Sequence, residues 1–268
     1  MGAEPLQPTR VHRFYKGERS SDSCVVSLRS EGFFPDDWLG SVTAALLVKL
    51  LDAAERLPVH AHPDRAFAQD HLDSRFGKTE AWMVLATREK QGEVWVGLSS
   101  PLEMGLYREW IERQDVEALL SSLNCVAVRA GDTIYVPAGI PHAIGSGVLL
   151  AELQEPTDFS IICEWQGFPI QPEDSHLGLG WDIALGALVL EAHEPVRRLP
   201  DEAHAFFWMD DRVEPAGRFG VLLVVEGEGS IDGERAWAGD AFALPAAAEP
   251  FAVDGDLRVL RCLAPEPA

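Results

Sequence analysis

The chain has 268 residues, of which 47% are hydrophobic and 24% charged, so it can bury the core of a folded protein. Its 43 acidic and 22 basic residues give a formal net charge of -21 at pH 7. A surface this acidic repels phosphate backbones and anionic lipid, which argues against nucleic-acid and membrane-surface partners.

The sequence also predicts a cytoplasmic location. No uncharged apolar run approaches the roughly 20 residues of a membrane span, and the first ten residues lack the apolar core of a signal peptide. The cysteines are scattered and form no Cys-x-x-Cys pair, which is typical of reduced core residues. They are Cys24, Cys125, Cys163 and Cys262.

The first part of the chain predicts strands and one short helix. A strand-like run covers residues 24–28, and a dense apolar block, LLVKLL, covers residues 46–51. Short apolar runs fit either a strand or a helix, and we favour a strand that leads towards His60. After the turn-forming Pro63-Asp64, residues 65–72 have the composition of a short helix.

The middle of the chain alternates further strands with helices. Strands are predicted at residues 81–85, 94–98, 126–128, 133–136, 148–154 and 159–165. Helical pieces are predicted within residues 103–120 and at 181–190. Residues 167–180, rich in Gly, Pro and acidic residues, are expected to form a loop, and residues 195–200 a linker.

After residue 206, short strands recur at a spacing of about ten residues. They are predicted at residues 219–225, 230–231, 241–244, 250–253 and 257–262. The expected turns between them are marked by Gly227, Gly229, Gly233, Gly239 and Gly255. This spacing predicts a small antiparallel sandwich or barrel.

Two histidines one residue apart, His60 and His62, are the first candidates for chemistry. Side chains of a strand repeat every two residues, so both imidazoles would lie on one face. Two neutral imidazoles that converge on one point suit a divalent transition metal. A pair of this kind without further ligands more often has a structural role.

A second motif occurs twice. Residues 131–139 read GDTIYVPAG and residues 239–247 read GDAFALPAA, so each copy has Gly-Asp, four strand residues and Pro-Ala. The Gly-Asp step turns the chain, and the proline redirects it after the strand. His142 follows the first copy by three residues, whereas Pro250 stands at the same place after the second. Only the first copy can therefore supply a ligand.

The pattern G-x5-P-x-G-x2-H, complete from Gly131 to His142, resembles the second motif of the cupin superfamily. This resemblance implies a jelly-roll β-barrel whose mouth collects a His-x-His pair, a glutamate and a last histidine. His60, His62, Glu80 and His142 take these four places. Glu80 follows His62 at a greater distance than in simple cupins, so the residues between them must leave the sheet and return.

Three segments together resemble the class I, zinc-dependent mannose-6-phosphate isomerases, from about Leu46 to Trp165. They read KLLDAAERLPVHAHPDRAFA, FGKTEAWMVL and GDTIYVPAGIPHAIGSGVLLAELQ. The resemblance implies a mainly β fold with two cupin domains and short helical insertions in and between them. It implies a metal-binding catalytic domain at residues 1–194 and a degenerate cupin without a metal site at residues 195–268. It also implies one zinc ion, although three histidines and a glutamate could hold manganese, iron or nickel.

The same resemblance implies an aldose–ketose isomerase that converts mannose 6-phosphate to fructose 6-phosphate, or acts on a related sugar, through a cis-enediol. A divalent cation stabilises the charge that develops on the sugar oxygens. The partner is then a small sugar or sugar phosphate, and no nucleotide cofactor is needed. Two other classes stay open, a non-catalytic sugar-binding cupin and a cupin oxygenase. The G-K-T-E segment favours the isomerase.

Four further residues are candidates for catalysis or substrate binding. Lys78 stands two residues before Glu80, so on a strand it shares the face of the ligand and can contact the sugar or move a proton. Glu155 is a second acid–base candidate, at the expected mouth of the barrel. Asp64 and Arg65 are candidates for substrate binding, although Asp64 also fits a turn cap.

The sequence departs from this family at two places in the site. His60 stands where the family has a glutamine ligand, and the replacement keeps a metal-binding atom. Ile161, counted back from Trp165, stands where the family has an arginine, and an apolar side chain cannot stabilise a phosphate or an oxyanion. A non-phosphorylated sugar is therefore an alternative substrate. The join at residues 41–44 also lies where a longer helical insertion is expected.

Overall fold

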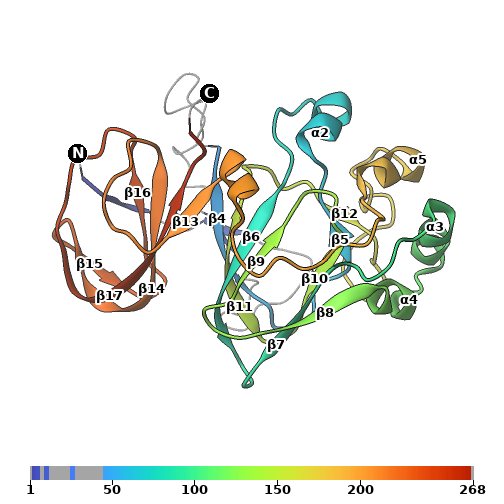
Figure 1. The fold of residues 1–268 in the computed structure, drawn as a ribbon, viewed down its shortest axis with the longest axis horizontal. Coiled ribbons are helices and arrows are strands. Elements are labelled where there is room, and N and C mark those ends of the chain that lie inside the picture. The colour runs from blue at the N-terminus through green and yellow to red at the C-terminus, as the bar shows by residue number, and fades with distance from the viewer. Residues whose placement is uncertain (1, 7–8, 12–24, 28–44, 267–268) are drawn as a thin grey trace.

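The computed structural model describes residues 2–6, 9–11, 25–27 and 45–266 (Figure 1). The strand predicted at 24–28 is confirmed for its centre, as β3 (Val25–Ser27). Cys24 and the join at residues 41–44 lie outside the described residues. The other cysteines, Cys125, Cys163 and Cys262, form no disulfide.

Two antiparallel sheets face each other and enclose the core of the larger barrel, which Figure 1 shows on the right. The first has the order β2 (Thr9–Val11), β3, β4 (Leu47–Asp52), β11 (Val148–Gln154), β6 (Glu80–Thr87) and β9 (Thr133–Val136). The second has the order β12 (Ile161–Ile162), β5 (His60–Ala61), β10 (His142–Ile144), β7 (Gly92–Leu98) and β8 (Leu123–Val128). Between them pack Trp82 and Ile134 of the first sheet and Val94 and Ile144 of the second. The expected mainly β, cupin-type fold is confirmed.

Short helices lie along the outside of this barrel. They are α2 (Arg65–Leu72), α3 (Met104–Arg113), α4 (Val116–Ser121) and α5 (Trp181–Ala184), with 3-10 turns at Leu185–Ala187 and Asp201–Ala205. Helix α2 matches its prediction at both ends and forms the excursion between His62 and Glu80. Within the described ranges no helix has the length and apolar character to cross a membrane.

The helix predicted at 181–190 is only partly correct, because helical structure ends at Ala187. The following residues are extended and bind the barrel through their backbone. The N–H of Val189 donates to the carbonyl of Gly139, and the carbonyl of Leu190 accepts from the N–H of Leu102.

The strand predicted at 159–165 is also shorter than expected, with only Ile161 and Ile162 in β12. The ladder is irregular on its C-terminal side, because the N–H groups of Cys163 and Glu164 both donate to the carbonyl of Val59.

A third sheet lies beside the barrel (Figure 1). Its order is β1 (Glu4–Leu6), β16 (Ala241–Leu244), β14 (Gly220–Ile231), β17 (Val253–Leu263) and β13 (Trp208–Asp210), and β15 (Glu234–Trp237) pairs with β14. An apolar cluster joins it to the barrel, with Val48 and Tyr135 from the barrel and Val221 and Leu260 from the sheet. Strand β1 brings the start of the chain into this sheet, and the division between residues 194 and 195 stays a prediction.

The prediction of separate short strands after residue 206 is wrong in two places. Residues 220–231 form one strand, β14, and it pairs with the equally continuous β17 from Gly220 opposite Leu263 to Ile231 opposite Val253. Gly227 and Gly229 of β14 and Gly255 of β17 therefore lie within strands instead of at turns. A Cβ on Gly227 would lie 1.7 Å from the carbonyl oxygen of Asp256, so glycine here permits the close approach of two strands.

The two Gly-Asp motifs adopt the same turn in both units. The carboxylate of Asp132 accepts from the N–H of Arg129, and that of Asp240 accepts from the N–H of Trp237. Each aspartate carbonyl also accepts from the N–H of a valine on a neighbouring strand, Val84 in the barrel and Val224 in the third sheet. The internal repeat read from the sequence is thus a structural repeat.

Candidate metal centre

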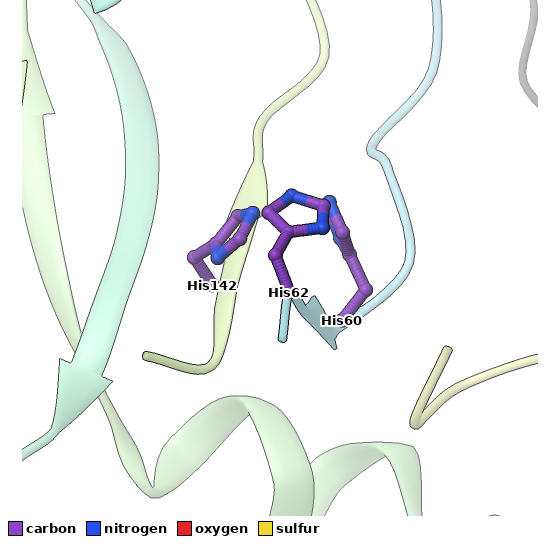
Figure 2. Close-up of side chains that lie close together, drawn as sticks. All are labelled: His60, His62 and His142. Carbon is purple, nitrogen blue, oxygen red and sulfur yellow. The ribbon is translucent and has the colours of Figure 1, made fainter. Parts of the chain in front are cut away.

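Strands β5 and β10 bring three histidines together. His142 lies directly opposite His60 in the antiparallel register, so the two side chains lie on the same face of the sheet. His62 follows His60 by two residues and points the same way. Figure 2 shows the three imidazoles converging, and candidate ligand atoms from all three lie within 4.8 Å of one another.

Backbone carbonyls fix the orientation of all three rings. The Nδ1 atoms of His60, His62 and His142 lie 2.8, 2.7 and 2.8 Å from carbonyl oxygens. These carbonyls belong to Pro58, Phe159 and Ile140. Because a carbonyl only accepts, each Nδ1 carries the proton and each Nε2 keeps its lone pair for the centre. Metal-binding histidines are typically oriented in this way.

Glu80, the first residue of β6, brings a carboxylate to the same point. Its Oε2 lies 3.3 Å from Nε2 of His62, and its Oε1 lies 3.3 Å from Nε2 of His142. The indole N–H of Trp82 donates to Oε1 at 3.1 Å. The four side chains expected to share a metal therefore lie together, and all four are buried.

Burial and neighbouring charges set the protonation of this cluster. Burial, reinforced by the charges of His142 and His62, holds the pKa of His60 well below its ordinary value. Burial and the Lys78 ammonium lower the pKa of His62 to about 3. Burial alone would raise the pKa of Glu80, but Lys78 and the imidazoles outweigh it and hold that pKa well below the usual range. At neutral pH His60 and His62 are therefore neutral imidazoles and Glu80 is a carboxylate.

This donor set fits a divalent transition metal. The Nε2 atom of His142 is buried and has no hydrogen-bond partner among the described residues. A buried polar atom without a partner costs free energy, which a bound cation would remove. Three imidazole nitrogens and a carboxylate suit zinc, and they also suit manganese, iron or nickel.

Lys78 lies between this centre and a second group of charges. Its Nζ is 2.9 Å from Nε2 of His62, 2.8 Å from Oε2 of Glu80 and 3.7 Å from Oε1 of Glu152. Burial lowers the pKa of Lys78, but the carboxylates of Glu152, Glu80 and Asp158 more than offset it, so the pKa is raised. Lys78 is thus a buried, protonated amine in contact with Glu80, although it precedes β6 and does not lie in a strand as the sequence predicted.

Sequence reasoning missed two charged residues near Lys78, Lys49 and Glu152. Lys49 of β4 lies opposite Glu152 of β11, with 3.4 Å between its Nζ and Oε1, and its Nζ lies 3.1 Å from Oδ1 of Asp158. Lys49 and Glu152 are each only 4% exposed. A signal for them was available, because each is a lone charge inside an apolar strand, where charges are rare unless they are paired.

The remaining candidates hold the excursion between His62 and Glu80 in place. Both oxygens of the buried Glu155 are engaged, one by Nε of Arg65 at 2.6 Å and the other by the N–H of Thr79 at 3.0 Å. Asp64 caps helix α2 by accepting from the N–H of Phe67 at 2.7 Å. The side chain of Arg65 remains 42% exposed. Direct roles of these three residues in chemistry stay predictions.

Ile161 does not face the histidines. It pairs with Ala61 and packs with it in the apolar cluster on the other side of the strand. Ile162 pairs with His60, so it is this residue that lies on the face of the centre. Both isoleucines are apolar, so neither supplies the positive charge that an arginine would bring.

Curated proteins resemble part of this chain, although no family model matches it. The mannose-6-phosphate isomerase of Streptococcus mutans is 40% identical over 113 residues, and the mannose-6-phosphate isomerase ManA of Bacillus subtilis is 38% identical over 113 residues. Each match covers 42% of this chain and 34% of the relative. The chain thus spans about a third of the length of the curated relatives it matches.

Solved structures resemble the whole fold. The crystal structure of the mannose 6-phosphate isomerase from Bacillus subtilis superposes with a TM-score of 0.73 at 20% identity and covers 98% of this chain and 99% of that chain. A variant of the phosphomannose isomerase from Salmonella typhimurium gives a TM-score of 0.56 at 15% identity, with 85% and 80% covered. At such identities the likeness establishes the fold.

Proposed function

We propose that this protein is a metal-dependent aldose–ketose isomerase of the mannose-6-phosphate isomerase type. The observation that carries the proposal is the buried cluster of three imidazoles, whose Nδ1 atoms contact backbone carbonyls, against Glu80 and the ammonium of Lys78. The identity of 38–40% to two mannose-6-phosphate isomerases over 113 residues supports this reaction class.

The reaction moves a hydrogen between C2 and C1 of an open-chain sugar through a cis-enediol. We propose that His60, His62, Glu80 and His142 hold one divalent ion, zinc by preference. When bound, the ion supplies positive charge for the two sugar oxygens on which negative charge develops.

Lys78 is the first of the proposed catalytic groups. As a protonated amine it can donate a hydrogen bond to a sugar oxygen as that oxygen gains charge. Its contacts with His62 and Glu80 keep its Nζ at the edge of the proposed metal site, at 2.9 and 2.8 Å.

Glu152 is the proposed proton acceptor. Its carboxylate lies 3.7 Å from Nζ of Lys78 and 3.4 Å from Nζ of Lys49, so two cations hold it next to the centre. A carboxylate in this position can take a proton from C2 and return it to C1. Glu155, the candidate from the sequence, is bound by Arg65 and Thr79, which favours a positioning role for the segment that carries Lys78.

The substrate is a small sugar or sugar phosphate, with mannose 6-phosphate as the first candidate. The exposed side chain of Arg65 is the cation we propose for a phosphate group, with Asp64 beside it. A non-phosphorylated sugar is the alternative, because Ile162, and not an arginine, lies beside His60 on the face of the centre. Cys125, Cys163 and Cys262 are free thiols, which supports a cytoplasmic location.

The test follows hydrogen exchange in D2O. Zinc-loaded protein is incubated with free and 6-phosphorylated mannose, glucose and fructose, and the sugars are followed by NMR. We expect conversion of one aldose to its 2-ketose with deuterium at C1 or C2. If no sugar exchanges a hydrogen at C1 or C2, the isomerase proposal is wrong. A sugar that binds without exchange would then favour the sugar-binding cupin.

A further inference from the structure

The third sheet contains a polar cavity that is separate from the histidine centre. Its volume is about 830 Å³. Strand β13, the segment that follows it and the end of β17 form its walls. The residues that matter to the argument are Trp208, Arg212, Arg218, Arg261 and Leu263.

Arg218 is a mostly buried cation whose positive charge is only weakly compensated. Its side chain is only 12% exposed, and its Nη1 atom is buried without a hydrogen-bond partner among the described residues. The nearest carboxylate oxygen, on Glu266, lies 4.0 Å away on a side chain that is 80% exposed. Burial of a guanidinium without an acceptor costs free energy, so such a group is rare without a ligand or a function.

The other charges of the cavity are already paired or exposed. Arg261 forms a bidentate ion pair with Asp210, with its Nε and Nη2 atoms 2.8 and 2.6 Å from the two carboxylate oxygens. The side chain of Arg212 is 72% exposed and lies 4.0 Å from the same carboxylate. The remaining acidic residues of the wall, Asp211 and Glu214, are exposed.

The ring of Trp208 defines where the guanidinium lies. The central carbon of Arg218 is 4.9 Å from the ring centroid, within the range of a cation–π contact. The ring itself stacks on His204, with 3.4 Å between centroids and 6° between planes. An arginine held in this way presents its N–H groups as a preformed fork, which matches the two oxygens of a carboxylate or a phosphate.

We propose that this cavity binds a small molecule through an oxyanion, a carboxylate or a phosphate group, which pairs with Arg218. In so acidic a chain it is unusual that Nη1 of a mostly buried arginine has no hydrogen-bond partner among the described residues, and the cavity gives it space for an external acceptor. The apolar wall, which includes Val213, Pro215 and Leu263, accommodates the rest of a small ligand. This proposal does not depend on the isomerase activity.

The test observes Arg218 directly. The Nε–H resonance of Arg218 is assigned in ¹⁵N-labelled protein by its absence from Arg218→Gln, or from Arg218→Lys if the glutamine variant does not fold. Inorganic phosphate, acetate and, as an ionic control, chloride are then titrated separately. We expect a saturable shift of this resonance with phosphate, acetate or both, and the one that shifts it identifies the group that the cavity accepts. If neither moves the resonance more than chloride does, the proposal is wrong.

A second measurement separates binding from a structural role. Arg218→Gln removes a cation that has no hydrogen-bond partner at Nη1, so its Tm in anion-free buffer should equal or exceed that of the wild type. The matched control is Arg258→Gln, which removes an exposed arginine paired with Glu226 at 3.2 Å elsewhere in the sheet and should retain the Arg218 shift. If the Tm of Arg218→Gln is well below that of Arg258→Gln and neither anion shifts the Arg218 resonance, Arg218 serves only the fold and the proposal is wrong.

Discussion

At the scale of single residues, the centre depends on contacts behind the ligands as much as on the ligands themselves. The buried carboxylate of Glu164 accepts from the N–H of Val59 at 2.9 Å and from Nη1 of Arg56 at 2.7 Å. Val59 directly precedes His60, so Glu164 anchors the backbone that positions the first imidazole. Buried polar contacts of this kind make the geometry of a site rigid.

Replacement of Glu164 tests how much this residue contributes to stability and to metal binding. Glu164→Gln keeps the shape but removes the charge that pairs with Arg56, so we expect a loss of about 2–3 kcal/mol in the free energy of unfolding. Zinc affinity should also fall, by about 10-fold or more. Urea denaturation and a competitive zinc titration measure the two effects. Glu109→Gln, on the exposed pair with Arg113, should change neither quantity.

A second residue-scale prediction concerns Lys78. Lys78→Met keeps an unbranched side chain out to Cε but removes the ammonium, and loss of one such donor typically lowers kcat by about 100-fold or more. The activity is measured on the sugar found by the exchange panel, with bound zinc determined in the same samples. Lys90→Met removes an exposed lysine in the turn between β6 and β7 and should keep full activity. Equal kcat values for the two variants would exclude Lys78 from the chemistry.

The site residues that the sequence predicted and those that it missed differ in one physical respect. His60, His62 and His142 stand in local motifs whose spacing fixes their direction. Lys49 and Glu152 meet only because β4 pairs with β11 in one particular register, and spacing along the chain does not contain that information.

At the scale of elements, predictions succeeded where a turn or cap marked the boundary. Helix α2 begins after Asp64, whose side chain caps it, and β9 follows the Gly-Asp turn; both match the predicted bounds. The predicted strand boundaries were wrong where glycine lies within a strand and not at a turn. Gly227 and Gly229 suggested turns, whereas they let β14 and β17 approach closely. Composition does not separate these two uses of glycine, because both depend on the absence of a Cβ.

The substitution Gly227→Ala tests whether glycine is needed at this position for the close approach of β14 and β17. Gly227 has a φ of +86°, and an added Cβ would meet the carbonyl oxygen of Asp256, so both strain and a clash oppose the substitution. We expect it to lower the free energy of unfolding by more than about 3 kcal/mol. Gly233→Ala provides the control, because its φ of +82° is similar but no atom lies within 4 Å of the added Cβ. Equal losses in chemical denaturation would mean that the strand approach adds nothing.

At the scale of the whole molecule, the centre joins the two sheets of the barrel. His60 and His142 come from one sheet and Glu80 from the other, so a cation shared by these side chains would link both halves of the barrel. Anything that binds only the folded state adds to its stability. The centre should therefore influence the stability of the protein as well as its activity.

Removal of the metal is the corresponding test. At a zinc concentration about a thousand times its Kd, binding contributes about 4 kcal/mol, which corresponds to a fall in Tm of roughly 10 °C when a chelator removes the ion. Added zinc should restore the original Tm. His142→Ala should retain little metal and show no response, whereas His71→Ala, on the exposed face of α2, should respond like the wild type. Unchanged metal content in His142→Ala would contradict the ligand assignment.

The two Gly-Asp turns have the same structure, although only one of them is followed by a metal ligand. Asp132 and Asp240 make equivalent backbone hydrogen bonds, yet the ligand that follows the first turn, His142, is replaced by Pro250 after the second. The turn thus forms without a metal ligand beside it, so its shape depends on the backbone hydrogen bonds and not on a metal. The third sheet therefore contains the turn of the barrel without its histidine ligand, so the two roles of the motif, to turn the chain and to supply a metal ligand, are separable.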